Sequence, residues 1–554
     1  MGINSTIDTD VLVIGGGTAG AVAAIEAKKI TNKVIVVSKG IVGKSGNTPM
    51  AEGGIQASFH IEDSPDDHFN DTMDAGRYVN DPSLVETLVT QAPNCIRALE
   101  RYGVRFKKLP DEGFFQYKTS GSSHPRCLWI IGGGVGLVQP LFKTVRKLGV
   151  SIIEDVMITK ILTSDNLVNG ACGIDFKTGE FLNIKAKSIV IAAGGNESLY
   201  RISDGSLDAS GDGAVLAYNA GAQLIDMEFI QFYPHALVYP ESLKGVIIPE
   251  EVYYKDLVGG KLINGLRKEF AGKYDPIRKE NTTRDILARA VFTEIAEGRG
   301  TQHGGVIIDL TRGNKERMME ILPALYNYLL MNGIDMFTEE VEVAPSAHYQ
   351  CGGIKINKKA ETTIEGLYAA GECTGGIDGA NRLSSNALTE AVVFGMIAGK
   401  NAAENALKVR NVHIDEKQAV SEYFMFDEIL KRDIDGGFDV MDIKKEIQRL
   451  MFDKVGVVRR KEELAQVIER LQEIKNDKLG QICLRNRGKI YNIEMLEYFE
   501  LCNLIENAII VTKTAQYRDE SRGSHFRADC PNEDNVNWKK NIIVQKHGNN
   551  ARLF

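Results

Sequence analysis

The sequence has no long block of lysine or arginine, and its 66 basic residues are outnumbered by 74 acidic ones. The resulting net charge of −8 argues against a nucleic-acid surface and against a basic patch that faces a membrane. No window reaches the apolar length of a membrane span, and the first residues lack the basic flank and apolar core of a signal peptide. We therefore expect a cytoplasmic protein that does not insert directly into a membrane.

Closely spaced cysteines are also absent. The eight cysteines are Cys95, Cys127, Cys172, Cys351, Cys373, Cys483, Cys502 and Cys530. Zinc and iron–sulfur sites need ligands at short, regular spacings, which these positions do not offer. We therefore predict no metal site in this chain, and any iron–sulfur centre must belong to another subunit.

Proline is scarce, with 14 in 554 residues, and the chain has no low-complexity tract, which argues against a long disordered region. Hydrophobic residues make up 43% of the sequence, as in ordinary globular proteins. A chain of this length exceeds what one hydrophobic core usually organises, so we expect two or more domains that share a cleft. Such a cleft suits a buried cofactor.

A glycine motif follows the first apolar segment. Residues 9–14 have the length and composition of a buried strand, and the segment GGGTAG then leads into an alanine-rich helix. Gly15 permits a tight turn, Gly17 lets the backbone approach a pyrophosphate, and Gly20 lets the helix pack on the strand. A second strand at residues 33–39 arrives at the expected distance. This βαβ pattern predicts a dinucleotide site, with the pyrophosphate at the helix N-terminus.

The choice between NAD and FAD depends on later segments. Ser38 ends the second strand, where many dinucleotide sites carry an acid for the ribose hydroxyls, so this end of the site leaves the cofactor open. Residues 188–195 and 366–372 form two further apolar strands that run into glycines and resemble strands of FAD enzymes. Glu372 could direct its carboxylate toward the ribityl chain, although a solvated acid at a strand end is the alternative. These segments favour FAD.

Residues 44–55 carry a family resemblance. Their sequence, KSGNTPMAEGGI, resembles the flavin-contacting loop of the succinate dehydrogenase and fumarate reductase flavoproteins, a family that includes L-aspartate oxidase. Other segments match in family order along nearly the whole chain: Ser123-His124-Pro125-Arg126, Ser210-Gly211-Asp212-Gly213-Ala214, Arg284-Asp285, Ala347-His348-Tyr349, Gly352-Gly353-Ile354, Asp378-Gly379-Ala380-Asn381-Arg382-Leu383, Ser385-Asn386 and Glu520-Ser521-Arg522-Gly523. Ordered matches over this length identify a superfamily but not a substrate.

The glycine motif and the resemblance together imply a set of FAD-binding residues. These are Gly15, Gly17, Thr18, Ala19, Gly20, Ser38, Lys39, Ser45, Gly46, Asn47, Thr48, Glu52, Gly53, Gly54, Ala193, Gly194, Asp212, Glu372, Arg382, Ser385, Asn386 and Leu388. Family members with covalently attached flavin carry a histidine at the position of Asn47. Because an amide cannot form that bond, we expect FAD to be held non-covalently.

The resemblance also implies three catalytic residues. Arg284 matches the family's proton donor or acceptor, while His348 and Arg382 match residues that bind a substrate carboxylate, for which the planar guanidinium of arginine is well suited. Arginine is ordinarily always charged, so a role as an acid implies a dry site and a proton relay behind it. The structural alternatives are that Arg284 begins a helix by pairing with an acid, that His348 lies beside a glycine turn, and that Arg382 forms an ion pair.

The chain departs from the family pattern at two places near this site. The family has His-Pro where this chain has Tyr233-Pro234-His235, so the usual cationic contact is either lost or moved to His235. The family's Thr-Glu pair appears as Pro249-Glu250, which keeps the acid and loses the hydroxyl. Tyr233 donates a hydrogen bond but carries no positive charge at neutral pH, so one end of a dicarboxylate is expected to be held less well.

We predict an α/β protein with a Rossmann-like FAD-binding domain and an inserted α+β capping domain, followed by a helical domain and a C-terminal arm. The expected limits are 1–235 with 344–407 for the FAD-binding domain, 236–343 for the capping domain, 408–512 for the helical domain and 513–554 for the arm. In the helical region, Leu464, Val467 and Leu471 fall on one helix face, which predicts core packing.

The resemblance implies a catalytic flavoprotein subunit that transfers hydride between flavin N5 and a carboxylate of the fumarate/succinate type, with electrons exchanged through a separate iron–sulfur subunit. L-Aspartate oxidase is the nearest alternative. Tyr233 and Pro249 keep two others open, namely a different substrate, as in the distantly related adenylylsulfate reductase, and a non-catalytic flavin electron-transfer subunit.

Overall fold

The largest sheet is built around the strand that precedes the glycine motif. In the computed structural model, which describes residues 5–253, 258–434, 436–548 and 550–554, its strand order is β6-β2-β1-β9-β8-β7, and β16 also pairs with β9. The strands are β1 (Ser5–Ile14), β2 (Val34–Ser38), β6 (Ser151–Glu154), β7 (Val156–Ser164), β8 (Leu167–Asp175), β9 (Glu180–Ile191) and β16 (Leu367–Ala369). The pairs β2–β6, β1–β2, β1–β9 and β9–β16 are parallel, whereas β7–β8 and β8–β9 are antiparallel.

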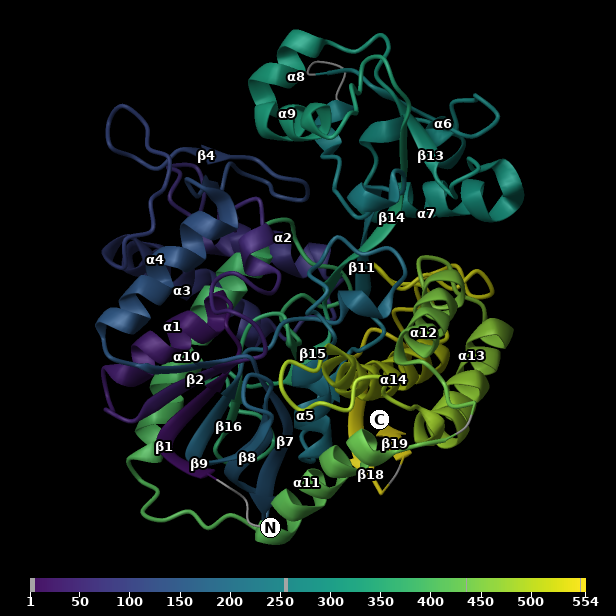
Figure 1. Cartoon of the computed structure of the whole chain (residues 1–554). Helices are drawn as coiled ribbons and strands as arrows, with labels where there is room; N and C mark the ends of the chain where they lie inside the picture. The colour runs from purple at the N-terminus through teal and green to yellow at the C-terminus, as the bar shows by residue number, and fades with distance from the viewer. Residues whose placement is uncertain (1–4, 254–257, 435, 549) are drawn as a thin grey trace.

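Helices cover this sheet closely. Val11, Leu12 and Val13 in β1 are fully buried, which explains why this strand is a continuous apolar run. Helix α1 (Thr18–Lys28) lies beside α10 (Asn386–Ala406), as Figure 1 shows. A Cβ atom on Gly399 of α10 would lie 2.1 Å from the carbonyl oxygen of Ala23, so glycine allows the two helices to touch. The remaining helices of this part are α2 (Pro65–Ala75), α3 (Pro82–Arg101), α4 (Gly133–Lys147) and α5 (Asp212–Asn219).

A four-stranded antiparallel sheet extends away from this body. Its order is β11-β14-β13-β12, with β11 (Ile230–Leu237), β14 (Val341–Gln350), β13 (Val306–Asp309) and β12 (Lys261–Ile263). The helices beside it are α6 (Ala271–Tyr274), α7 (Arg284–Glu294), α8 (Lys315–Ile321) and α9 (Pro323–Met331). Residues between Leu237 and Val343 form a hydrophobic cluster of their own. In Figure 1 this part stands at the top in teal, and β11 and β14 connect it to the rest.

Two smaller sheets complete the strands. One has the order β17-β15-β10-β18-β19 and the other β3-β5-β4. Their strands are β10 (Leu224–Ile225), β15 (Gly353–Lys355), β17 (Thr374–Gly375), β18 (Ile543–His547), β19 (Asn550–Leu553), β3 (Gly54–Gln56), β4 (Gln116–Tyr117) and β5 (Cys127–Trp129). Short 3-10 or π-helical segments occur at Thr48–Met50, Glu197–Leu199, Glu241–Leu243, Glu250–Val252, Lys279–Asn281, Ile295–Arg299, Ile474–Lys478 and Leu479–Gln481. The C-terminal strands thus join a sheet that begins far earlier in the chain.

The helical part contains α11 (Glu416–Lys431), α12 (Val440–Lys454), α13 (Lys461–Glu473) and α14 (Ile493–Tyr517). The face of α13 that carries Leu464, Val467 and Leu471 is buried, as the pattern predicted. Helix α14 continues through residue 512, where the helical domain was expected to end. Among the helices of the described residues, none combines the length and the apolar character that crossing a bilayer requires.

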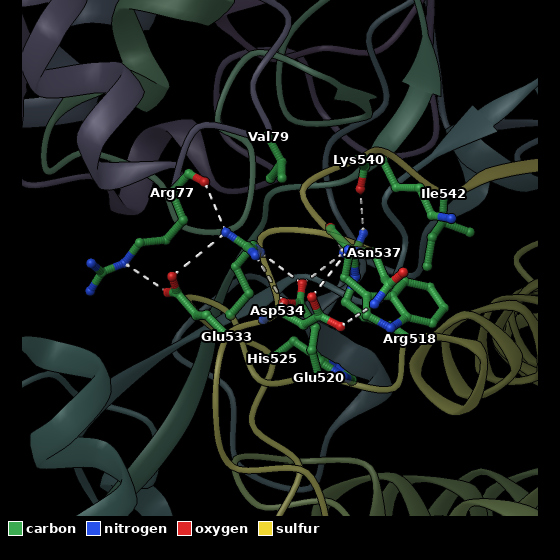
Figure 2. Close-up of polar contacts among 12 residues, drawn as sticks. Arg77, Val79, Arg518, Glu520, His525, Glu533, Asp534, Asn537, Lys540 and Ile542 are labelled. Atoms are coloured by element: carbon green, nitrogen blue, oxygen red, sulfur yellow. Dashed lines mark hydrogen bonds and ion pairs between the residues drawn. The ribbon is translucent and has the colours of Figure 1, made fainter.

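The C-terminal arm is held by a buried network of charges (Figure 2). Arg518 donates hydrogen bonds to Glu228 (2.7 Å) and Glu520 (3.1 Å), and all three side chains are fully buried. Arg522 adds two hydrogen bonds to Glu520. The neighbouring Ser524 bonds to the carbonyl of Ala380 through its backbone N–H (2.9 Å). The network therefore ties the arm to the segment before β11 and to the loop that carries Arg382.

Candidate functional site

A cavity of about 330 Å³ opens at the carboxyl ends of the parallel strands β1, β9 and β16. This volume lies within the range typical of small-molecule sites, and the end of a parallel sheet is where doubly wound folds bind ligands. The predicted cofactor residues that line it are Gly15, Gly17, Thr18, Ala19, Ser38, Lys39, Ser45, Gly46, Asn47, Thr48, Glu52, Gly53, Gly54, Ala193, Gly194, Asp212, Glu372, Arg382, Ser385 and Leu388. Gly20 and Asn386 are not among the lining residues.

The glycine turn has the geometry that a dinucleotide requires. Gly15 adopts φ +132°, and a Cβ on it would lie 2.0 Å from the carbonyl oxygen of Ala192. Gly17 occupies the N-cap of α1 and has no side chain to cap the helix, and the first N–H of the helix, that of Thr18, donates to the hydroxyl of Thr48 (3.2 Å). A Cβ on Gly20 would lie 2.1 Å from the carbonyl oxygen of Gly15, so Gly20 supports the turn from behind. The N-terminus of α1 lies at the cavity wall and fits the pyrophosphate of FAD.

Asn386 supports the site without lining it. Its side chain is fully buried and contacts His68 (2.8 Å, Oδ1 to Nε2) and the hydroxyl of Thr72 (3.1 Å, from Nδ2). Burial lowers the pKa of His68 to about 4, so its ring is neutral at physiological pH. These contacts hold the first turn of α10 next to Ser385, which does line the cavity.

Lys39 and Asp212 meet at one end of the cavity. The ammonium of Lys39 contacts Asp212 (2.8 Å) and Glu500 (2.6 Å). Burial lowers the pKa of Lys39, but the two carboxylates outweigh this effect and raise it above its ordinary value. Asp212 also accepts a hydrogen bond from Asn503 (2.7 Å). This end of the cavity is therefore fixed by paired charges that come from three distant parts of the chain.

The side chain of Asn47 is hydrogen-bonded to three groups of the protein. Its Nδ2 donates to Glu372 (2.9 Å) and Glu197 (3.2 Å), and its Oδ1 accepts from the backbone N–H of Ser206 (2.8 Å). Because Ser206 N–H can only donate, the orientation of the amide is determined by its surroundings. The side chain is thus engaged with the protein at the position where covalent family members carry histidine.

Arg382 and His348 form a second polar unit in the cavity wall. Arg382 Nη2 lies 3.0 Å from His348 Nε2, and His348 Nδ1 lies 3.0 Å from a carboxylate oxygen of Asp204. Since arginine only donates, Nε2 accepts from Arg382 and Nδ1–H donates to Asp204, which describes a neutral ring. Arg382 Nε is buried and has no partner among the described residues. Arg382 therefore keeps donor capacity for an anionic ligand.

Arg284 forms a second cationic group in the cavity wall. It begins helix α7, and its Nε donates to Glu250 at 2.5 Å. The guanidinium also lies 4.8 Å from the ring centre of Tyr233. Burial lowers the pKa of Arg284, but Glu250 and Tyr233 outweigh burial and raise it above the ordinary value, so this group remains charged. Glu250 lies behind Arg284 and is not a lining residue.

His235 does not take the place of the missing family histidine in the cavity wall. Its side chain is fully buried, 4.7 Å from the ring of Tyr253, and neither ring nitrogen has a hydrogen-bond partner among the described residues. Burial, aided by the charge of Arg284, lowers the pKa of His235 to about 3. The ring is therefore neutral, and of Tyr233 and His235 only Tyr233 lines the cavity.

Several residues at the site were not anticipated. Asp204 orients His348, Gln231 accepts from Arg382 (3.2 Å), and Glu197 shares Asn47 with Glu372. Of these residues, Gln231 was the easiest to predict from the sequence. It precedes Tyr233 by two positions on a strand, and residues two apart on a strand share a face. Asp204 lies in a loop and Glu197 begins a 3-10 segment of three residues, so no periodicity points to either residue.

Comparisons with known proteins agree with this geometry. A model of the FAD binding domain matches residues 10–388, and a model of the fumarate reductase flavoprotein C-terminal region matches residues 444–553. The chain is 40% identical to one of the subunits of the fumarate reductase (CoM/CoB) of Methanothermobacter marburgensis, over 97% of each chain. It is 31% identical to "L-aspartate oxidase 2-a, chloroplastic" of Nicotiana tabacum, over 95% of this chain and 82% of the relative. A solved structure of E. coli quinol fumarate reductase FrdA superposes with a TM-score of 0.92 at 28% identity, covering 99% of this chain and 96% of that one.

The fold and the glycine-lined cavity define an FAD-dependent oxidoreductase. The chain belongs to the family of fumarate reductase and succinate dehydrogenase flavoprotein subunits. The prediction of a Rossmann-like FAD fold and of FAD as the cofactor is confirmed.

Proposed function

We propose that the protein is a catalytic flavoprotein subunit that reduces or oxidises a carboxylate of the fumarate/succinate type. The observation that carries the proposal is that Arg284, His348 and Arg382, from three separate parts of the chain, line the same cavity as the glycine turn of the FAD site. A subunit that only passed electrons would have no need for two arginines beside its flavin. These residues therefore argue against the non-catalytic alternative.

Arg382 and His348 bind one carboxylate of the substrate in this proposal. The buried Nε of Arg382, left without a protein partner among the described residues, points to this role, and His348, held by Asp204, is kept in a defined tautomer. When bound, FAD supplies the hydride, or accepts it in the reverse direction. The protein then has to orient the double bond, exclude water and deliver one proton to the neighbouring carbon.

Arg284 provides that proton, and Glu250 passes a second proton, taken up from solvent, to the guanidine group. The 2.5 Å contact between Arg284 Nε and Glu250 places an acid against the arginine, at a residue that does not line the cavity. An arginine that gives up its proton must be reprotonated rapidly, because its free base is strongly disfavoured. Glu250 keeps this position although Pro249 replaces the family's threonine.

FAD is held non-covalently, and the predicted cofactor residues that line the cavity hold it. The engagement of Asn47 with Glu197, Glu372 and Ser206 supports this proposal. Tyr233 replaces a cationic contact, so the second carboxylate of a dicarboxylate rests mainly on Arg284. A substrate with one carboxylate and a larger neutral group is therefore also compatible with the cavity.

The wider organisation follows from the same proposal. Residues 236–343 act as a capping domain over the FAD-binding domain of 1–235 and 344–407. The helical domain, expected at 408–512, extends to the end of α14 at Tyr517, and the arm follows it. The cytoplasm is the proposed location. An iron–sulfur subunit is the proposed electron partner, because the chain's cysteines lack cluster spacing and several of the fumarate reductases that it resembles are named as flavoprotein subunits. These assignments rest on the family and on the separate hydrophobic cluster of the cap.

Purified, FAD-loaded protein tests the proposal. We expect fumarate to be reduced with reduced methyl viologen as the electron donor, and Arg284→Ala to abolish turnover while retaining FAD. Arg289→Ala is the matched control, because Arg289 lies on the same helix and outside the cavity wall. Aspartate oxidation with oxygen is measured in parallel, since the Nicotiana relative favours it as the second candidate. Activity with neither substrate would refute both reactions.

A further inference from the structure

Two carboxyl groups, one buried and one partly exposed to the cavity, meet at Asn47 in the wall of the cofactor cavity. Glu197, from the short helix that follows β9, and Glu372, which follows β16, both accept a hydrogen bond from Asn47 Nδ2, at 3.2 and 2.9 Å. Glu197 is fully buried, and Glu372 and Asn47 line the cavity. One amide group therefore connects two acids that follow different strands of the main sheet.

The two carboxyl groups also lie beside each other next to Gly195. An ideal Cβ on Gly195 would lie 2.4 Å from Glu197 Oε1 and 2.7 Å from Glu372 Oε1, so both oxygens occupy the space that a side chain at Gly195 would fill. Glu197 Oε1 has no hydrogen-bond donor among the described residues. Two acceptor oxygens that face each other in a buried site need a proton between them.

No cation compensates a second negative charge at this place. In the described parts of the chain, neither Glu197 nor Glu372 forms an ion pair with lysine, arginine or histidine. Lys39, which lines the same cavity, is engaged by Asp212 and Glu500. Glu372 receives one further hydrogen bond, from the backbone N–H of Gln350 (3.3 Å). Burial and the neighbouring Glu372 raise the pKa of Glu197 well above its ordinary value.

We propose that Glu197 is a positioning residue of the cofactor site, which shares one proton with Glu372 and, together with Asn47, holds Glu372 in the orientation that meets bound FAD. The O–H of Glu197 donates to the carboxylate of Glu372, and no bond other than this hydrogen bond forms or breaks. The inference rests on FAD binding in the cavity and not on the identity of the substrate. It assigns a role to a residue that neither the glycine motif nor the flavin-contacting loop contains.

The pair also explains how the site holds FAD without a covalent bond at position 47. A neutral Glu197 leaves Glu372 as the only charged member, and the hydrogen bonds from Glu197, Asn47 and Gln350 fix its carboxylate. A carboxylate that is already oriented loses little entropy when it accepts hydrogen bonds from cofactor hydroxyls. The three residues thereby stabilise the bound cofactor through a preorganised acceptor.

The test separates the charge of Glu197 from its position. Apo-protein is reconstituted with FAD to measure the dissociation constant, and spectroelectrochemistry gives the midpoint potential of bound FAD. The variants are Glu197→Gln, which is neutral and keeps a donor, Glu197→Ala, which removes the contact, and Glu372→Gln, which removes the charge. Glu180→Gln, at an exposed position at the start of β9, is the matched control.

We expect Glu197→Gln to leave both the midpoint potential and the FAD dissociation constant unchanged within about threefold, because one neutral donor replaces another. Glu197→Ala should weaken FAD binding by about 10- to 100-fold, the effect of losing a hydrogen bond to a charged group. Glu372→Gln should raise the midpoint potential, because a negative charge near the flavin disfavours electron uptake. Glu197→Asp, which withdraws the carboxyl group from Glu372, should resemble Glu197→Ala.

Two results would overturn the inference. If Glu197→Gln raised the potential as much as Glu372→Gln does, Glu197 would be ionised in the native protein. If both Glu197→Ala and Glu197→Asp bound FAD as tightly as wild type, Glu197 would not position the acceptor. The stoichiometry of FAD on the wild-type protein is determined first, so a failure of cofactor binding itself is distinguished from a failure of this inference.

Discussion

Replacing Arg518 by leucine should strongly destabilise the C-terminal arm. The guanidinium group pairs with three fully buried carboxylates, those of Glu228, Glu520 and Asp226, the last at 3.9 Å. It also donates to the backbone carbonyls of Trp538 (2.8 Å) and Lys540 (2.9 Å), as Figure 2 shows in part. Arg522 still binds Glu520 in the variant, but Glu228 loses its charged partner. Leaving a buried charge unpaired costs about 3–5 kcal/mol, so we expect the free energy of unfolding to fall by this amount.

Trp538 offers a direct readout of this change. The chain contains only one other tryptophan, Trp129, so a Trp129→Phe background isolates the fluorescence of the arm. The Trp538 ring lies 5.7 Å from the ring of Tyr517 and 5.9 Å from the Arg518 guanidinium. Unfolding in guanidinium chloride is compared with that of Arg487→Leu, whose ion pair with Asp433 is mostly exposed and is worth about 0–1 kcal/mol. If Arg518→Leu shifted the transition no more than Arg487→Leu, the buried network would not stabilise the arm.

Because the pKa of buried His235 is about 3, against an ordinary value near 6.5, the unfolded chain takes up its proton first as pH falls, and stability is lost below pH 6.5. His235→Leu should therefore reduce the loss of unfolding free energy between pH 7 and pH 5 by about 2 kcal/mol in urea titrations, and an unchanged pH dependence would contradict the burial argument. Gly20→Ala places a Cβ 2.1 Å from the carbonyl oxygen of Gly15 and should weaken FAD binding at least about tenfold. Gly480→Ala, whose Cβ meets no atom within 4 Å, is the control and should leave FAD binding unchanged. Equal FAD affinities of the two variants would argue against a role of the glycine turn in FAD binding. Tyr233→His places a group that can carry positive charge beside Arg284, so the KM for fumarate should fall several-fold in steady-state assays. A raised KM would show that the lack of positive charge at Tyr233 does not weaken binding of the substrate carboxylate.

The sequence was sufficient to predict the strands and the glycine turn that form the FAD site. Apolar runs that end in glycine indicate such strands, because a buried parallel strand is apolar on both faces. The glycine lets the backbone N–H groups approach a phosphate closely. The expected strands and the glycine turn appear in the structure as β1, β2, β9 and β16 around one cavity. Gly20 was correctly given a packing role, although it was also grouped with the cofactor residues and does not line the cavity.

The prediction of the candidate substrate-binding residues depended on the family resemblance. Arg284, His348 and Arg382 lie in separate segments, and nothing in their local spacing indicates that they share a cavity. Asp204 and Glu197 were missed because their partners, His348 and Asn47, are more than a hundred residues away. The expected end of the helical domain at residue 512 falls inside α14, since the helix continues without a breaking residue to Tyr517. Contacts of this kind are tertiary and leave no periodic pattern in the sequence.

The central claim is that the FAD cavity also binds and reduces a carboxylate with the help of Arg284. The most direct test is a single-turnover experiment without any electron partner, in which protein with fully reduced FAD is mixed anaerobically with fumarate and flavin absorbance is followed. We predict that the flavin of the wild-type protein becomes oxidised, and that the flavin of Arg284→Ala remains reduced although FAD stays bound. Flavin that remains reduced in the wild type, or equal rates in both proteins, would contradict the claim.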